Sequence, residues 1–247
     1  MKQQYLFIIV AIVCFIAGYW LALPGQKVIA PEAGVPLSIV SIRDTSSSQA
    51  YRITGEYPQF RNVSSSFNAA IANYVTSNLA QFKTDSVANL QARIATMPSG
   101  TKNTLPAQAF TFASSWTPEQ INDQYISIVV RLDYFNGGAN GAQLLKTFNY
   151  NVTTGTVMTL ADVFPNVPTY LQQISQLAVQ ELTNSENDAS GGYAATDMIR
   201  QGAAPTADNY ANFIFNDDVV TIYFPKYQVA PGSFGEQQVS IVRSTIN

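Results

Sequence analysis

The segment from Gln124 to Phe135 alternates between apolar and polar side chains, and this alternation constrains the fold more than any other feature of the chain. One face holds Ile126, Ile128, Val130, Leu132 and Tyr134, and the other face holds Ser127, Arg131 and Asp133. A two-residue period predicts a β-strand with one buried face. The fold must therefore place a second layer over the apolar side.

A helix is expected to supply that layer. It follows Asn62, a candidate N-cap, and its apolar side chains recur at helical spacing. These are Val63, Phe67, Ile71, Tyr74, Val75, Leu79 and Phe82. The apolar stripe and the apolar strand face are natural partners.

Further strands and one further long helix are expected around this pair. The strands are predicted over residues 37–43, 51–57, 109–116, 146–152, 157–160, 212–215, 219–224 and 238–242, with Pro58 closing the second. The helix starts near Pro168, and a shorter one is expected over residues 194–201. This order predicts an α+β fold in which helices pack on a mainly antiparallel sheet, with a hint of two similar lobes.

The chain begins with an apolar segment that we separate from the globular part. Tyr5 to Leu23 carries no charge and is as long as the ~20 residues that cross a bilayer as a helix. We predict a transmembrane anchor at residues 5–23, a cytoplasmic stub at 1–4 and a linker at 24–36, with the bulk extracytoplasmic. Secretion after cleavage is less favoured, because a signal peptide has an apolar region of roughly 7 to 15 residues.

Composition excludes several kinds of catalysis. The chain has no histidine, and its one cysteine, Cys14, lies inside the apolar run. Histidine triads, cysteine–histidine pairs and histidine-ligated metals are therefore excluded, so we expect no enzyme, no catalytic residue, no metal and no cofactor. The net charge of −3 argues against nucleic acid as a partner. Carboxylate-dependent glycan hydrolysis remains an open alternative, because it needs only two acidic residues.

A family resemblance appears in the segment from Tyr134 to Gly141, Tyr-Phe-Asn-Gly-Gly-Ala-Asn-Gly. It resembles the Tyr-x-x-Gly-Gly-Ala-His signature of the domain of unknown function shared by RsiV-type anti-sigma factors and PdaC-type peptidoglycan deacetylases. Matches continue at residues 148–151, 154–155, 159–164 and 224–231 and at Gly235. Asn140 stands where the family usually has histidine, and Asn151 where it usually has aspartate.

The resemblance implies two lobes and a binding function. Residues 134–247 form the C-terminal lobe, and residues 37–133 resemble the companion domain of RsiV- and PdaC-type proteins. RsiV-type ectodomains bind lysozyme, so the implied function is a membrane-anchored, non-enzymatic binding module for a wall glycan (peptidoglycan) or a lysozyme-like basic protein. An excess of acidic residues between Glu181 and Asp218 could attract a basic partner. A structural subunit of the envelope is a further alternative.

The candidate ligand-binding residues lie in the glycine-rich segment, residues 134–141, and in the matching segment at residues 224–231. Glycines allow a ligand to approach the backbone, and an exposed tyrosine offers a flat amphipathic face. The candidates are Tyr134, Gly137, Gly138, Asn140, Tyr227 and Gln228.

Overall fold

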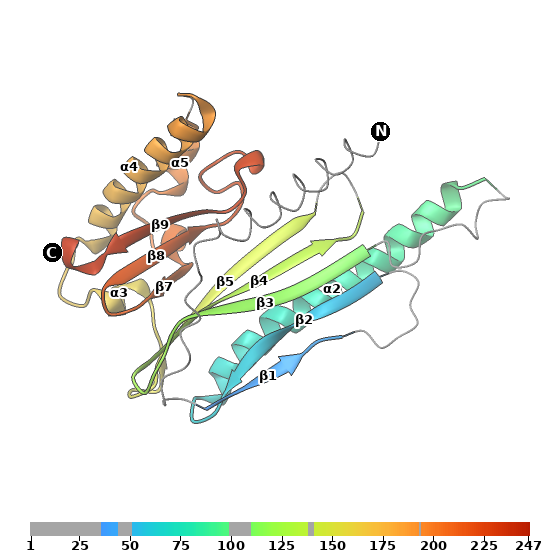
Figure 1. Ribbon diagram of the computed structural model, residues 1–247, viewed down its shortest axis with the longest axis horizontal. Helices are drawn as coiled ribbons and strands as arrows, with labels where there is room; N and C mark the ends of the chain where they lie inside the picture. The colour runs from blue at the N-terminus through green and yellow to red at the C-terminus, as the bar shows by residue number, and fades with distance from the viewer. Residues whose placement is uncertain (1–35, 44–50, 99–109, 138–140, 193) are drawn as a thin grey trace, which may run out of the picture. The chain divides into compact units, whose positions relative to one another are not determined.

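The computed structural model describes residues 36–43, 51–98, 110–137, 141–192 and 194–247 (Figure 1). The chain divides into two compact units, residues 1–30 and 31–247, and all described residues belong to the second. The predicted stub and anchor, and residues 24–35 of the predicted linker, lie outside the described residues. Within these described ranges, no helix combines the length and the apolar character needed to cross a membrane.

Six strands form the larger sheet. In sheet order they are β1 (Leu37–Ser41), β2 (Tyr51–Phe60), β3 (Phe110–Ile121), β4 (Tyr125–Phe135), β5 (Ala142–Asn151) and β6 (Thr156–Val157). Neighbouring strands are antiparallel except β2 and β3, which are parallel. A parallel pair needs a long crossover connection, and here the connection contains the helix α2 (Ser65–Thr96).

The helix α2 covers the apolar face of this sheet, as the two sequence patterns predict (Figure 1). Phe67, Ile71, Val75 and Phe82 are buried in one core with the apolar face of β4. The N-cap is Ser64 and not Asn62: Phe67 N donates to Ser64 Oγ at 3.3 Å. Serine suits this position because its short side chain reaches an otherwise unpaired N–H of the first turn.

Several predicted strand ends are wrong. The strand expected to end at residue 116 continues to Ile121, and the one expected to start at residue 146 starts at Ala142. The strand expected to stop at Pro58 continues to Phe60. Beyond Gly55, β2 pairs only with β1, so the missing N–H of Pro58 can face the side of the strand that has no neighbour. The strand expected over residues 157–160 ends at Val157, and a short helix, α3 (Leu160–Val163), follows.

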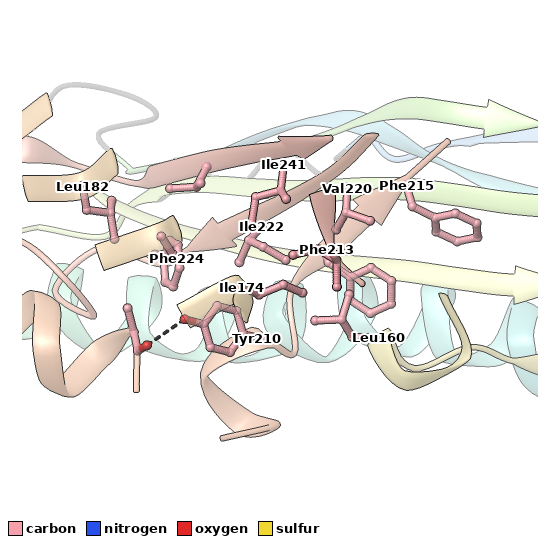
Figure 2. Packing of buried hydrophobic residues seen from close by; sticks show 14 of the residues in the cluster. Leu160, Ile174, Leu182, Tyr210, Phe213, Phe215, Val220, Ile222, Phe224 and Ile241 are labelled. Atoms are coloured by element: carbon pink, nitrogen blue, oxygen red, sulfur yellow. Dashed lines mark hydrogen bonds between the residues drawn. The ribbon is translucent and has the colours of Figure 1, made fainter. Parts of the chain in front are cut away.

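A smaller sheet has its own core. It consists of the antiparallel strands β7 (Phe213–Phe215), β8 (Val219–Phe224) and β9 (Gln237–Val242). Its buried side chains share a core with α3, α4 (Tyr170–Ser190) and α5 (Thr196–Gly202). Figure 2 shows Ile174 and Leu182 of α4 among Phe213, Ile222 and Phe224. The α+β class with a mainly antiparallel sheet is confirmed.

The predicted lobe boundary after Asp133 stays a prediction. It falls within β4, which pairs with β3 on one side and β5 on the other. Three short 3₁₀ helices complete the described chain: η1 (Asp208–Tyr210), η2 (Gly232–Phe234) and η3 (Arg243–Thr245).

Candidate functional site

The face of the larger sheet opposite α2 is polar, and the smaller sheet covers only part of it. Val129 and Leu145 pack there against Ile214 and Tyr223. The covered part of β4 extends as far as Arg131, whose Nη2 lies 3.0 Å from Glu236 Oε1. Past Arg131, the next residue on this face of β4 is Asp133, whose side chain is exposed to solvent.

The Arg131 guanidinium is held on two sides. It forms the ion pair with Glu236, and its Cζ lies 5.0 Å from the centre of the Tyr223 ring. Burial lowers the pKa of Arg131, but the hydrogen bond and charge of Glu236 outweigh this effect and leave the pKa raised. Arg131 therefore stays charged and fixes the edge of the cover.

A groove of about 520 Å³ opens beside this edge. Its floor includes a row of four residues, each paired in register with the next: Thr54 of β2, Ala113 of β3, Asp133 of β4 and Gln143 of β5. The four share one face because side chains alternate along each strand. The small side chain of Ala113 leaves the row hollow between Thr54 and Asp133.

Asp133 and Gln143 form the polar centre of the row. Gln143 Nε2 donates to Asp133 Oδ1 at 2.9 Å, and both side chains are exposed. The remaining carboxylate and amide oxygens are open to ligand N–H and O–H groups. Among the described residues that line the groove, Asp133 is the one carboxylate. Glycoside hydrolysis by two carboxylates needs a second acid, so the groove does not support that alternative.

Two cations also line the groove. Arg52 lies two residues before Thr54 on the same face of β2, and Lys226 comes from the segment between β8 and β9. The ion pair of Arg131 with Glu236 is the one formed within the described part of the chain. Neither Arg52 nor Lys226 therefore has a carboxylate partner there.

Tyr227 follows Lys226 and presents a flat aromatic ring to solvent. Its side chain is 65% exposed, and its backbone φ is +75°, a conformation uncommon for a residue other than glycine. A Cβ atom added at Gly232 would overlap the Tyr227 ring, so the ring lies directly on the Gly232 backbone. Lys226 Nζ lies 5.2 Å from the ring centre. The segment thus holds an aromatic surface next to a residue that lines the groove.

One of the six predicted ligand-binding residues, Tyr134, is among the residues that line the groove. Its ring, however, lies on the α2 face of the sheet, where it packs against Phe112 and Phe82 with ring centres 6.3 and 6.2 Å apart. Gly141 and Gly235, from the two predicted segments, line the same groove. Gly137 instead lines a hollow between α2 and β3 that includes Phe110.

The other candidates divide between a structural role and the undescribed part of the chain. Gln228 Nε2 donates to Gly202 O at 2.8 Å and to Asn209 O at 2.9 Å, so its amide ties its own segment to the α5 region. Gly138 and Asn140 lie outside the described residues. The ligand-binding role of all six candidates stays a prediction.

The sequence did not indicate five polar groove residues as ligand contacts: Arg52, Thr54, Asp133, Gln143 and Lys226. For Asp133 the sequence did contain a signal, because the alternation of apolar and polar residues in β4 places it on the polar face of the strand. The described residues contain no group of three or more histidine, cysteine, aspartate or glutamate side chains that could hold a metal ion. The groove therefore offers hydrogen bonds and charges, and one of its lining residues, Lys226, lies next to the exposed Tyr227 ring.

Two family models match the chain. One, described as deacetylase PdaC, matches residues 45–143, and the other, described as a protein of unknown function (DUF3298), matches residues 161–244. The resemblance to a domain shared by PdaC-type proteins is confirmed. Lysozyme binding and the likeness to RsiV-type proteins stay predictions.

Two curated relatives match about half of the chain each. The peptidoglycan-N-acetylmuramic acid deacetylase PdaC of Bacillus subtilis is 32% identical over 123 residues, which are 50% of this chain and 26% of that protein. An esterase of Mycobacterium tuberculosis is 29% identical over 120 residues, which are 49% of this chain and 50% of the esterase. The chain therefore corresponds to no more than half of either relative.

Solved structures support the fold. A DUF3298 family protein from Bacteroides fragilis has a TM-score of 0.54 at 12% identity, and one from Pseudomonas aeruginosa has 0.53 at 13% identity. In both comparisons the match covers 85% of this chain and 91% of the other. At this identity the likeness concerns the fold alone.

The prediction that this chain is not an enzyme is wrong in the light of its relatives. Both curated relatives carry the names of enzymes, so the chain is similar to enzymatic families. The absence of histidine, and of any cysteine other than Cys14, excludes particular mechanisms but does not imply the absence of enzymatic function.

Proposed function

We propose that the groove beside Asp133 binds acylated glycan of the cell wall and orients it for hydrolysis at an acyl group. The observation that carries this proposal is the polar row of Thr54, Asp133 and Gln143, with the exposed Tyr227 ring next to groove residue Lys226. The names of the two curated relatives supply the class of substrate and reaction. The predicted anchor at residues 5–23 would keep the groove at the outer surface of the membrane.

The chemistry of the groove suits an amino sugar. A sugar presents hydroxyl and amide groups around its edge and C–H groups on its faces. The open oxygens of Asp133 and Gln143 can accept from the hydroxyl and amide groups, and the amphipathic Tyr227 ring can cover a face. The volume of about 520 Å³ lies within the range of roughly 300–1,000 Å³ typical of small-molecule sites.

The reaction class follows from what the relatives have in common. A deacetylase cleaves an acyl group from nitrogen or oxygen, and an esterase cleaves one from oxygen. The named relative of the first kind acts on N-acetylmuramic acid, an acylated sugar acid, and we extend that ligand class to this groove. The groove residues are assigned binding and orientation of the acylated sugar. Orientation accelerates hydrolysis when the attacking water is held against the acyl carbon as well; water then adds to that carbon, the bond to the sugar nitrogen or oxygen breaks, and acetate and the protonated sugar group leave.

The test is equilibrium binding of defined wall oligosaccharides to the full-length chain in detergent. Asp133→Asn should weaken binding at least tenfold, because a hydrogen bond to a charged group contributes about 1.5–3 kcal/mol and each ~1.4 kcal/mol is tenfold. Asp123→Asn, in the exposed turn between β3 and β4, is the matched control and should bind normally. Tyr227→Phe should retain binding and Tyr227→Ala should lose part of it.

Release of acetate from the same oligosaccharides measures the second half of the proposal. If the wild type releases acetate and the Asp133→Asn variant releases it more slowly, the result supports orientation of the glycan in the groove. Binding that is equally tight in wild type, Asp133→Asn and Tyr227→Ala would place the glycan elsewhere and refute the assignment of this groove.

A further inference from the structure

The groove lining has more basic than acidic side chains, although the chain as a whole carries a net negative charge. The whole sequence has 13 basic and 16 acidic residues, yet the described groove lining has two cations, Arg52 and Lys226, and one acid, Asp133. The two cations come from distant parts of the sequence, one from β2 and one from the segment after β8. A local excess of positive charge on a negatively charged protein indicates an anionic ligand.

Within the described part of the chain, neither cation is paired with a carboxylate. Glu236 is taken by Arg131, and the Asp133 carboxylate accepts from the Gln143 amide. Within the described ranges, no hydrogen bond or ion pair involves the side chain of Arg52 or Lys226. Structural arginines and lysines are commonly engaged by carboxylates or carbonyls, as Arg131 and Arg243 are here. Arg52, and Lys226 apart from its contact with the Tyr227 ring, therefore leave donors that no described residue accepts from and that a ligand can use.

Arg52 also lies where two hollows meet. A second hollow of about 720 Å³ shares Arg52 and Thr54 with the groove and adds Arg43 and Glu56. A ligand longer than one sugar can pass from one hollow into the other along this face of the sheet. Arg52 would then contact the ligand near its middle.

We propose that Arg52 and Lys226 bind the carboxylate of a sugar acid and make the groove select acidic over neutral wall glycan, an inference that rests on the proposed function. The planar guanidinium of Arg52 matches the two oxygens of a carboxylate. Thr111, its partner in register on β3, lines the same groove and can donate a hydroxyl. Asp133 repels a carboxylate, so the acid is directed to Arg52 and Lys226, and neutral hydroxyl and amide groups are directed to Asp133.

The test compares two forms of one ligand, a tetrasaccharide of alternating N-acetylglucosamine and N-acetylmuramic acid with its carboxylates free, and the same tetrasaccharide with the carboxyl groups amidated. We expect the full-length wild type to bind the free acid at least tenfold more tightly in low salt. This preference should shrink as salt screens the exposed charges. Arg52→Gln and Lys226→Gln should each reduce the preference several-fold, because they weaken binding of the free acid more than binding of the amidated form.

Matched variants separate this effect from a general loss of charge or of folding. Arg61→Gln, just past the other end of β2, and Lys146→Gln, on the α2 side of the sheet, should keep the wild-type preference. Arg52→Lys keeps the charge without the planar fork and should fall between wild type and Arg52→Gln. Thermal melting checks that each variant is folded, and an unfolded Arg52→Gln is replaced by Arg52→Lys in the comparison.

Each outcome decides between the two proposals. Equal affinity of the wild type for both tetrasaccharides overturns the acid site and leaves glycan binding intact. A preference that survives in both Arg52→Gln and Lys226→Gln overturns the assignment of these residues. Binding of neither form overturns the proposed function and the acid site together. A glycerol phosphate polymer that binds as tightly as the free acid would refute selection of a carboxylate.

Discussion

The Ser127 hydroxyl donates to Asn149 Oδ1 at 2.7 Å, and both residues are buried where the smaller sheet covers the larger one. The two residues are direct partners on β4 and β5. Each also binds the backbone of β7: Phe215 N donates to Ser127 Oγ at 2.9 Å, and Asn149 Nδ2 donates to Phe213 O at 2.8 Å. Side chains of the larger sheet thus bind the backbone of the smaller sheet. These hydrogen bonds form a joint between the two sheets, and the joint fixes the smaller sheet beside the groove.

Ser127→Ala should lower the free energy of unfolding by about 1–3 kcal/mol, the cost of leaving buried polar groups without a partner. The N–H of Phe215 and one hydrogen bond of Asn149 lose their partner in this variant. Chemical denaturation measures the change. The control is Ser240→Ala, whose hydroxyl is exposed and should change stability by no more than about 0.5 kcal/mol. Equal stability of the two variants would refute the joint.

The sequence predicted the elements of this fold better than the site that they form. The alternation of β4 and the apolar stripe of α2 are local patterns, and both elements form as predicted. The groove depends on register between strands, which local patterns do not encode. Ala113 and Asp133 lie side by side because of strand pairing. Thr54 reaches Ala113 only through the parallel pairing of β2 and β3.

Tyr210 should make stability fall at alkaline pH. Its side chain is 1% exposed, and its hydroxyl donates to Ala203 O at 2.7 Å, the hydrogen bond drawn in Figure 2. Burial raises the pKa of Tyr210 to about 12, against an opposing hydrogen bond with Ser175. The neutral form is thus favoured by folding, so its contribution is complete below pH 10 and is lost as the pH rises from about 10 to 12. The expected loss is roughly 2–3 kcal/mol at ~1.4 kcal/mol per pKa unit.

The matched variant is Tyr210→Phe, followed by urea denaturation at several pH values between 8 and 11. At pH 8 it should cost about 1 kcal/mol for the lost hydrogen bond, since Ala203 O still accepts from Ser175 Oγ at 2.6 Å. Its stability should then decline less steeply with pH than that of the wild type. Burial also raises the pKa of Tyr74 and Tyr223, so some decline remains in the variant. Parallel pH profiles would contradict the assignment to Tyr210.

The ion pair of Arg131 and Glu236 should contribute more than a surface pair. Their side chains are 25% and 17% exposed, which places the pair between exposed pairs worth about 0–1 kcal/mol and buried ones whose disruption costs about 3–5 kcal/mol. We expect Glu236→Ala to cost about 1–2 kcal/mol. A double-mutant cycle with Arg131→Met isolates the interaction from the other losses. A coupling energy of zero would mean that Tyr223 alone holds Arg131.

Gly232→Ala should weaken glycan binding without touching a ligand contact. The backbone of Gly232 lies outside the left-handed region, so alanine is tolerated there, but its Cβ would overlap the Tyr227 ring. The ring must then leave its position on the Gly232 backbone, next to groove residue Lys226. Loss of an aromatic contact of about 0.5–1.5 kcal/mol corresponds to roughly two- to tenfold weaker binding. The same assay on Tyr227→Ala and on the double variant provides the control: once the ring is gone, Gly232→Ala should have no further effect. An additional loss in the double variant would show that Gly232 acts on binding by a route other than the Tyr227 ring.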